Sequence, residues 1–298
     1  MRGLRLINVS LREVLTSIGF YACVLLTALL CFTAKAYYDI DENKSYSVIG
    51  AYMELSREEM LTRYKLSSYE IISCIFGGWL PTFIPIIAAF PFMPLICDER
   101  ESKFMRYSVF RSTRLSFPTG NFLTAMITGG FAIMTGFSIF AGAAFVMFPD
   151  IGEYAPELRE PAECLLPETY PLFSKLGYPY LIALDFIEMF LYGAVSSLPA
   201  LIVTAFIKNK YLVLCIPFFL KYITSQLHKG LLIEAYSDIE NIDQWLLDIL
   251  SVTEPDTIGK IFSYGENIWK SALIYAVLLI IGFALYCTAM NRRVDFGE

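Results

Sequence analysis

Residues 98–121, DERESKFMRYSVFRSTRLSFPTGN, decide the fold because they form a charged island between two apolar runs. Each run is long enough to cross a bilayer, for which about 20 apolar residues in a helix suffice. The island is also the most basic segment of the chain, with Arg100, Lys103, Arg106, Arg111 and Arg114. Because short loops rich in Lys and Arg stay on the cytoplasmic side of a membrane, we expect this loop in the cytoplasm.

The composition is that of an integral membrane protein. Of the 298 residues, 56% are hydrophobic and 17% are charged, and the mean hydropathy is +0.54. The net charge of -6 argues against nucleic acid as a partner, because nucleic-acid-binding domains are basic. Every cysteine except Cys164 lies in or at the end of an apolar run, so we expect no disulfide framework in the polar loops.

Six apolar runs predict six membrane-spanning helices, and hence an all-α, polytopic fold in which 1–298 is a single transmembrane domain. The expected spans are 16–37, 72–97, 122–148, 179–207, 211–227 and 271–290. The fifth is the weakest, because it is short and carries Lys221 and His228 toward its end. Basic residues gather in one set of connecting segments and acidic residues in the other, which predicts both termini on the cytoplasmic side.

The segments outside the spans carry further helical patterns. Residues 1–15 place apolar and basic side chains on separate stripes, which favours a helix in the membrane interface over a polar lead-in to the first span. Ser56 and Glu59 have the spacing of a capping box, which predicts a short outer helix through Lys65. Residues 238–251 place apolar side chains on one face, so we expect the outer segment 228–270, between the fifth and sixth spans, to be amphipathic and structured.

No catalytic set is evident. The chain has one His, no cysteine pair at metal-ligand spacing and no phosphate-binding loop of the GxxxxGK(S/T) type. We therefore expect a protein that is not an enzyme and holds no metal or cofactor of its own. Glu58, Glu59 and Arg63 match the EExxxR pattern of an intramembrane metalloprotease family. They lie in a polar segment without the His residues that family needs, which argues against that activity.

Four prolines interrupt the second expected span: Pro81, Pro85, Pro91 and Pro94. A proline inside a helix removes a hydrogen bond, so we expect this span to be kinked or partly unwound. The kinked span is either a moving wall of a transport pathway, with Pro81 and Pro85 beside it, or a static fit to neighbouring helices.

Ionisable residues inside the spans are the other functional candidates. Asp185 and Glu188 lie three residues apart in the fourth span, either facing a pathway or in the headgroup region near the outer boundary. Lys221 either pairs with one of these acids or extends toward the outer surface. The third span instead carries small residues that favour close helix packing or a dimer face, namely Gly129, Gly130, Gly136, Gly142 and Ala143.

The central loop has two interpretations from its residues alone. Between residues 101 and 110 there is no Gly or Pro, and Phe104 and Tyr107 recur at helical spacing. This pattern is typical of a short helix that docks on a cytoplasmic partner. The alternative is a solvated connector whose charges only set the topology.

The same loop carries a resemblance to a known family. Asp98, Glu99, Arg100, Glu101 and Ser102 follow the second span, and Ser112, Thr113 and Arg114 precede the third. With six spans, an interfacial N-terminal helix and both ends inside, the chain resembles the membrane (permease) subunit of type-2 ATP-binding cassette (ABC) transporters. It departs from the family pattern at Ser102, where Gly is common, and at Asn121, where Lys often opens the third span.

The resemblance implies a subunit of an exporter in the bacterial cytoplasmic membrane, with a peptide, a drug or a lipid-like molecule as cargo. The loop would be a coupling helix that docks on a separate ABC ATPase, which would hold the ATP and Mg²⁺. A second membrane subunit, identical or different, would complete the pathway. The implied docking residues are Asp98, Glu99, Glu101, Phe104, Tyr107, Arg111 and Arg114. Two other functions stay open, a membrane-embedded sensor or scaffold, and an ion-coupled carrier that uses Asp185 and Glu188.

Overall fold

The computed structural model describes residues 2–39, 44–102, 115–153, 177–207, 209–237 and 268–295. These parts are mostly helical, and four helices are long and apolar enough to cross a membrane: Leu80–Glu101, Ser116–Met147, Tyr178–Thr204 and Ala272–Arg292. They correspond to the expected second, third, fourth and sixth spans. Ile7–Leu15 and Ile18–Cys31 would together form a fifth, bent by 60°. The helices agree with a multi-pass membrane protein.

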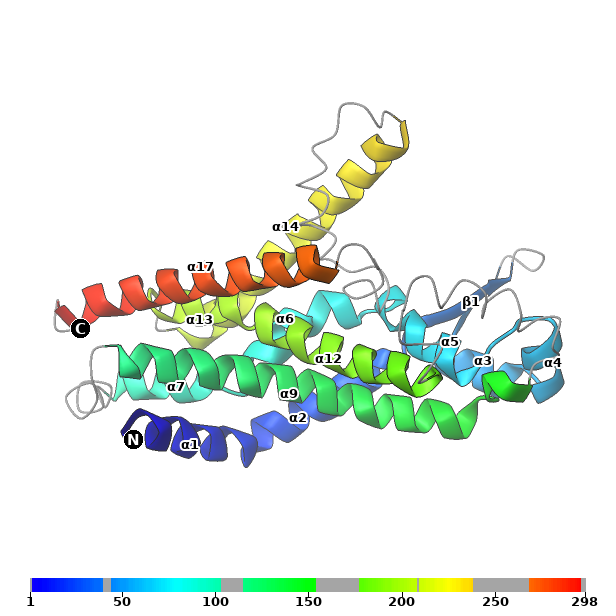
Figure 1. The fold of residues 1–298 in the computed structure, drawn as a ribbon, viewed down its shortest axis with the longest axis horizontal. Coiled ribbons are helices and arrows are strands. Elements are labelled where there is room, and N and C mark those ends of the chain that lie inside the picture. The colour runs from blue at the N-terminus through cyan, green and yellow to red at the C-terminus, as the bar shows by residue number, and fades with distance from the viewer. Residues whose placement is uncertain are drawn as a thin grey trace.

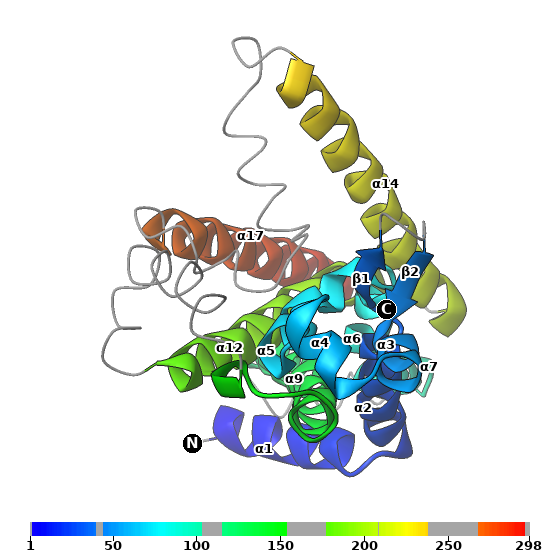
Figure 2. The same cartoon turned by 90° about the vertical axis from the view of Figure 1, so that its right-hand side faces the viewer.

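The long helix α9 (Ser116–Met147) is the centre of the bundle (Figures 1 and 2). α2 (Ile18–Cys31), α6 (Leu80–Ala89) and α12 (Tyr178–Ser196) pack along it, and the amphipathic helix α1 (Arg2–Leu15) packs near its start. The sequence predicted α1 as a helix, and the structure confirms it. The bend between α1 and α2 follows Ser17, whose side chain caps α2 by accepting from the Phe20 N–H.

Glycines allow the close helix contacts on α9. A Cβ on Gly136 would lie 2.5 Å from the Cβ of Thr27 in α2, and a Cβ on Gly193 of α12 would lie 2.8 Å from the Gly129 carbonyl oxygen. A Cβ on Gly130 would lie 2.7 Å from the ring of Phe190 in α12. The prediction of close packing by small residues is therefore confirmed at these positions. An added Cβ on Gly142 would meet nothing within 4 Å, so this glycine packs on no described helix of the same chain, and the predicted alternative of a dimer face stays a prediction there.

The second expected span begins later than the sequence predicts. Residues 68–77 form α5 (Ser68–Ser73) and the short 3₁₀ helix η1 (Cys74–Gly77), and the apolar span starts with α6 and continues as α7 (Met93–Glu101). Pro81 and Pro94 lie in the first turns of α6 and α7, where a missing N–H costs no helical hydrogen bond. The expectation that each proline removes an internal bond is therefore wrong for these two. Pro85 lies inside α6, and Pro91 lies in the break before α7.

One end of the bundle carries a small module that the all-α prediction missed. The strands β1 (Lys35–Asp39) and β2 (Lys44–Ser47) pair antiparallel, with Tyr37 opposite Tyr46. α2 consequently ends at Cys31, six residues before the expected end of the first span. Two short helices follow, α3 (Val48–Glu54) and α4 (Arg57–Thr62). The capping box at Ser56 and Glu59 is confirmed, but α4 ends at Thr62 rather than at Lys65, which has a φ of 49°.

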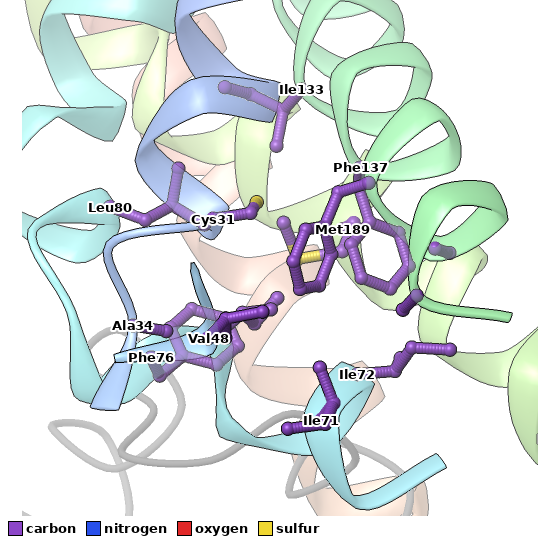
Figure 3. Packing of buried hydrophobic residues seen from close by; sticks show 14 of the residues in the cluster. Cys31, Ala34, Val48, Ile71, Ile72, Phe76, Leu80, Ile133, Phe137 and Met189 are labelled. Atoms are coloured by element: carbon purple, nitrogen blue, oxygen red, sulfur yellow. The ribbon is translucent and has the colours of Figure 1, made fainter. Parts of the chain in front are cut away.

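The module and the bundle share one hydrophobic core. Figure 3 shows Val48 of α3 beside Ala34 and Phe76, and the same cluster includes Ile71 of α5 and Phe137 of α9. Apolar side chains from both parts are thus removed from solvent together, which is the main stabilising term for such contacts. The hairpin module is therefore fixed to the bundle rather than tethered to it.

The remaining helices form the other side of the bundle. The fourth span breaks after Ser196, and α13 (Leu198–Thr204) follows, with Pro199 in its first turn. α14 (Lys210–Ser237) is longer than the expected fifth span and is not among the four long apolar helices. Its first half packs on α6, α7 and α13, whereas its second half projects away from the bundle (Figures 1 and 2). α17 (Ile268–Asp295) packs on α9, α12 and α13.

Both chain termini lie at one end of the bundle, together with the end of α7 and the start of α9, and the hairpin lies at the other end (Figure 1). This arrangement agrees with the predicted topology, in which the termini and the central loop share one face. Assignment of that face to the cytoplasm stays a prediction. The loop residues Phe104, Tyr107, Arg111 and Arg114 lie outside the described residues, as do Cys164 and most of the segment 228–270.

Candidate functional site

A cavity of about 410 Å³ lies among α6, α12, α13, α14 and α17. This volume is within the range of small-molecule sites, which is about 300–1,000 Å³. The lining is mostly apolar and includes Pro85 of α6 and Pro217 of α14, both of which lie inside their helices. The predicted pathway residues Pro85 and Lys221 therefore meet at one cavity, whereas Pro81 is not part of its lining.

Lys221 is the one charged side chain that lines the cavity in the described part of the chain. Its Nζ donates a hydrogen bond of 2.7 Å to the hydroxyl of Tyr192 and lies 5.1 Å from the centre of the same ring. The hydrogen bond holds the ammonium group against α12. In the structure Lys221 thus contacts Tyr192 of α12, the helix that also carries Asp185 and Glu188.

Asp185 and Glu188 are buried within the protein, with exposed fractions of 3% and 0%. They lie seven and four residues before Tyr192, which puts all three on one face of α12. Neither acid lines the cavity. Asp185 Oδ2 has no hydrogen-bond partner among the described residues. The sequence analysis missed Tyr192, although its spacing from the two acids is a signal that points to the same face.

Two contacts at the terminal end of the bundle involve the predicted docking segment. Asp98 forms an ion pair with Lys210, and Arg100 Nη1 donates to the carbonyl oxygen of Ile207 at 3.1 Å. The first contact joins the end of α7 to the start of α14, and the second joins it to the segment between α13 and α14. Asp98 therefore has a role within the chain, whatever it contacts outside. Glu99 is half-buried, whereas Asp98 and Glu101 are exposed.

The residues of the protease-like pattern have structural roles in the hairpin module. Glu59 caps α4 by accepting from the Ser56 N–H at 2.8 Å, which lowers the pKa of its carboxyl. Asp39, 3% exposed, accepts from Arg63 Nη2 at 3.3 Å and from the Tyr64 hydroxyl at 2.9 Å. Burial and the hydrogen bond to Asp39 raise the pKa of Tyr64 to about 12. This arrangement binds strand β1 to α4 and contains no His.

No group of three or more His, Cys, Asp or Glu side chains within the described ranges is arranged to hold a metal ion. We find no match to this chain among protein-family models or among curated proteins. We therefore infer the function from the arrangement of the helices, from the cavity, and from the polar contacts at the terminal end of the bundle.

Proposed function

We propose that the chain is the membrane subunit of an exporter related to type-2 ABC transporters, in which a separate ATPase subunit supplies the energy and a second membrane subunit completes the pathway. The observation that carries the proposal is the half-open, mostly apolar cavity between the helices, since a transport subunit needs a site for its cargo between the two aqueous faces. Pro85 and Pro217 interrupt two of its wall helices, and prolines inside helices are common points of bending.

The contacts at the terminal end suggest how a partner would act on the cavity. In this proposal the ATPase docks where α7 ends and α9 begins, through Glu101 and the loop 103–114. The Asp98–Lys210 ion pair joins α7 to the start of α14, and the Arg100–Ile207 hydrogen bond joins α7 to the segment just before α14. A displacement of α7 would therefore move α14, which forms one wall of the cavity. Amphipathic α1, at the same end of the bundle, would lie on the membrane face that the ATPase approaches (Figure 1).

The docking role is tested by co-expression of the chain with the ATPase encoded next to its gene. We expect ATPase activity to co-purify with the wild type and to be lost when Glu101→Lys and Arg114→Glu are combined. Glu58→Lys reverses an exposed charge at the hairpin end and serves as the matched control, which should keep the ATPase. Retention of a fully active complex by the double variant would exclude docking at this loop.

An ion-coupled carrier is the second candidate, because two acids are buried in one predicted span. The two functions differ in their energy source. Transport by a carrier should stop when the proton gradient is dissipated and should continue when ATP is depleted at a fixed gradient. The ABC-type proposal predicts the reverse.

A further inference from the structure

The two short helices of the hairpin module, α3 and α4, expose different kinds of side chain (Figure 1). On α4 the exposed residues are polar: Arg57, Glu58, Glu59 and Thr62. On α3 the exposed residues are large and apolar except for the last one: Ile49, Tyr52, Met53 and Glu54. The opposite side of α3 is buried in the core and is apolar as well. A helix in water has a polar outer side, which α4 has and α3 lacks.

The start of α3 lies at the same level as the start of the second span. The N–H of Val48, the first residue of α3, donates to the carbonyl oxygen of Ala34 at 3.0 Å. A Cβ on Gly78 would lie 2.8 Å from the Cα of the same Ala34. Gly78 directly precedes Trp79, which is 63% exposed and lies just before α6. Because exposed tryptophans are typical of the boundary between membrane and water, α3 begins at such a boundary.

The exposed side of α3 continues onto the surface of a predicted span. The ring centre of Tyr52 lies 6.1 Å from that of Phe148, in an edge-to-face contact. Phe148 directly follows α9, whose last turn exposes 46% of Phe145 and 87% of Val146. Exposed apolar side chains on a helix that crosses a membrane face lipid tails, which are equally apolar. The lipid around the end of α9 therefore reaches α3 beside Tyr52.

The apolar patch on α3 suits a bilayer better than a protein partner. Its three side chains are 44–78% exposed, and even a whole aromatic side chain buries no more than about 250 Å². They therefore offer well under the roughly 800 Å² that each partner contributes to a stable protein interface. A bilayer sets no such minimum, because each apolar group that leaves water contributes separately.

We infer that α3 lies in the interfacial layer of the membrane, with Ile49, Tyr52 and Met53 in contact with lipid, whereas α4 faces water. The partner of this surface is the boundary between headgroups and acyl chains, into which the apolar face of an interfacial helix enters by about 5–10 Å. The hairpin module is then seated in the membrane surface rather than raised above it. This inference needs no ATPase and no transport, so it and the proposed function fail separately.

Spin-label accessibility tests the surroundings of α3. The purified full-length chain, in bilayer discs of phosphatidylcholine, carries a nitroxide on a non-canonical amino acid in place of Met53, Glu58 or Val146, one at a time. Oxygen concentrates in lipid, whereas a nickel chelate stays in water. We expect the label at Met53 to collide more with oxygen than with nickel, at a depth of about 5–10 Å. The label at Val146 is the lipid reference and should behave likewise, and the label at Glu58 should show the reverse order.

Two results at Met53 would overturn the inference. More collisions with nickel than with oxygen would show that α3 faces water, and protection from both would show that protein covers it. A measurement without a label guards against a label that disturbs the fold. Chloramine-T, a charged oxidant, should oxidise Met53 of the wild type at least about tenfold more slowly than the methionine introduced by Glu58→Met, because a charged reagent enters lipid poorly. Equal rates would also overturn the inference.

Discussion

The two halves of the bundle are packed in different ways. In the packed half, α2, α6 and α12 approach α9 so closely that Gly129, Gly136 and Gly193 have no room for a Cβ. In the open half, α13, α14 and α17 line a cavity of about 410 Å³ together with one face of α6 and α12, and Phe219 and Tyr222 of α14 are more than half exposed. The packed half also holds the hairpin module through a shared core (Figure 3).

This difference in packing indicates which half of the bundle can move. Close-packed interiors resist changes of even one methylene group, so the helices around α9 form a rigid support. α14 has fewer partners along its second half, carries a proline in its interior, and is joined to α7 by an ion pair at one end. A moving wall therefore belongs to the α14 side, and α9 is the reference against which it moves. Four predictions test this contrast.

The largest effect is expected at the helix crossing of Gly136. Gly136→Ala places a Cβ against Thr27 and the Val24 carbonyl oxygen at 2.5 and 2.6 Å, so α2 and α9 must separate. We expect a loss of about 1–3 kcal/mol in the free energy of unfolding, the usual cost of overpacking. Denaturant unfolding in detergent measures it. Gly142→Ala, on the same helix in open space, is the control and should not destabilise. Equal stability of both variants would contradict the close crossing.

A smaller loss is expected from Asp39→Ala in the hairpin module. The change removes the acceptor of the buried Tyr64 hydroxyl and the partner of Arg63. An unpaired buried polar group costs about 1–3 kcal/mol, and we expect a value toward the lower end because Arg63 can reach water. Glu58→Ala, an exposed acid in the same module, should leave the unfolding midpoint within error of the wild type. A neutral Asp39→Ala would mean that the module is not held through this contact.

The open half should accept added volume. Ile202→Phe enlarges a half-buried side chain in the cavity lining, where space is already present. We expect the free energy of unfolding to change by less than about 1 kcal/mol, since filling a cavity is neutral or stabilising. A loss of stability as large as that of Gly136→Ala would show that the two halves are equally tight.

The smallest effect is a pH dependence of the hairpin module. The folded-state pKa of Tyr64, about 12, lies above its ordinary value of 10.0. Folding therefore favours the neutral phenol, and this stabilisation is fully present below pH 10 and is lost as the pH rises toward 12. The wild type should be more stable than Tyr64→Phe at pH 8, and the difference should shrink between pH 10 and 12. A constant difference over this range would exclude titration of Tyr64 as its cause.

Local patterns were predicted from the sequence more accurately than the contacts between distant segments. The capping box at Ser56 and Glu59 was predictable because all its contacts lie within three residues. The hairpin was missed because its stability depends on Tyr37 and Tyr46 packing on Tyr64, which is distant in the sequence. The predicted loss of a helical hydrogen bond was wrong at Pro81 and Pro94, because a proline removes such a bond only if it lies beyond the first turn, and the sequence did not show where α6 and α7 begin.

For the candidate site, too, single residues were predictable from the sequence, whereas their contacts with one another were not. Lys221 and Pro85 were identified from the sequence because a charge or a proline inside an apolar run is costly and therefore conspicuous. Their meeting with Tyr192 and Tyr275 at one cavity was not predictable, since it depends on how α12, α14 and α17 cross. For the same reason the sequence did not distinguish Gly136, at a crossing, from Gly142, in open space.

By itself, then, the sequence determined that the chain has several long apolar helices, a basic loop between two of them and an amphipathic start. Those properties follow from hydrophobic transfer and helical periodicity, which act within one segment. Only the tertiary structure decided which glycines touch a neighbour, which helix Lys221 contacts and that a mostly apolar cavity exists. Those features arise from the relative placement of helices, which is set by side-chain packing between residues far apart in the chain.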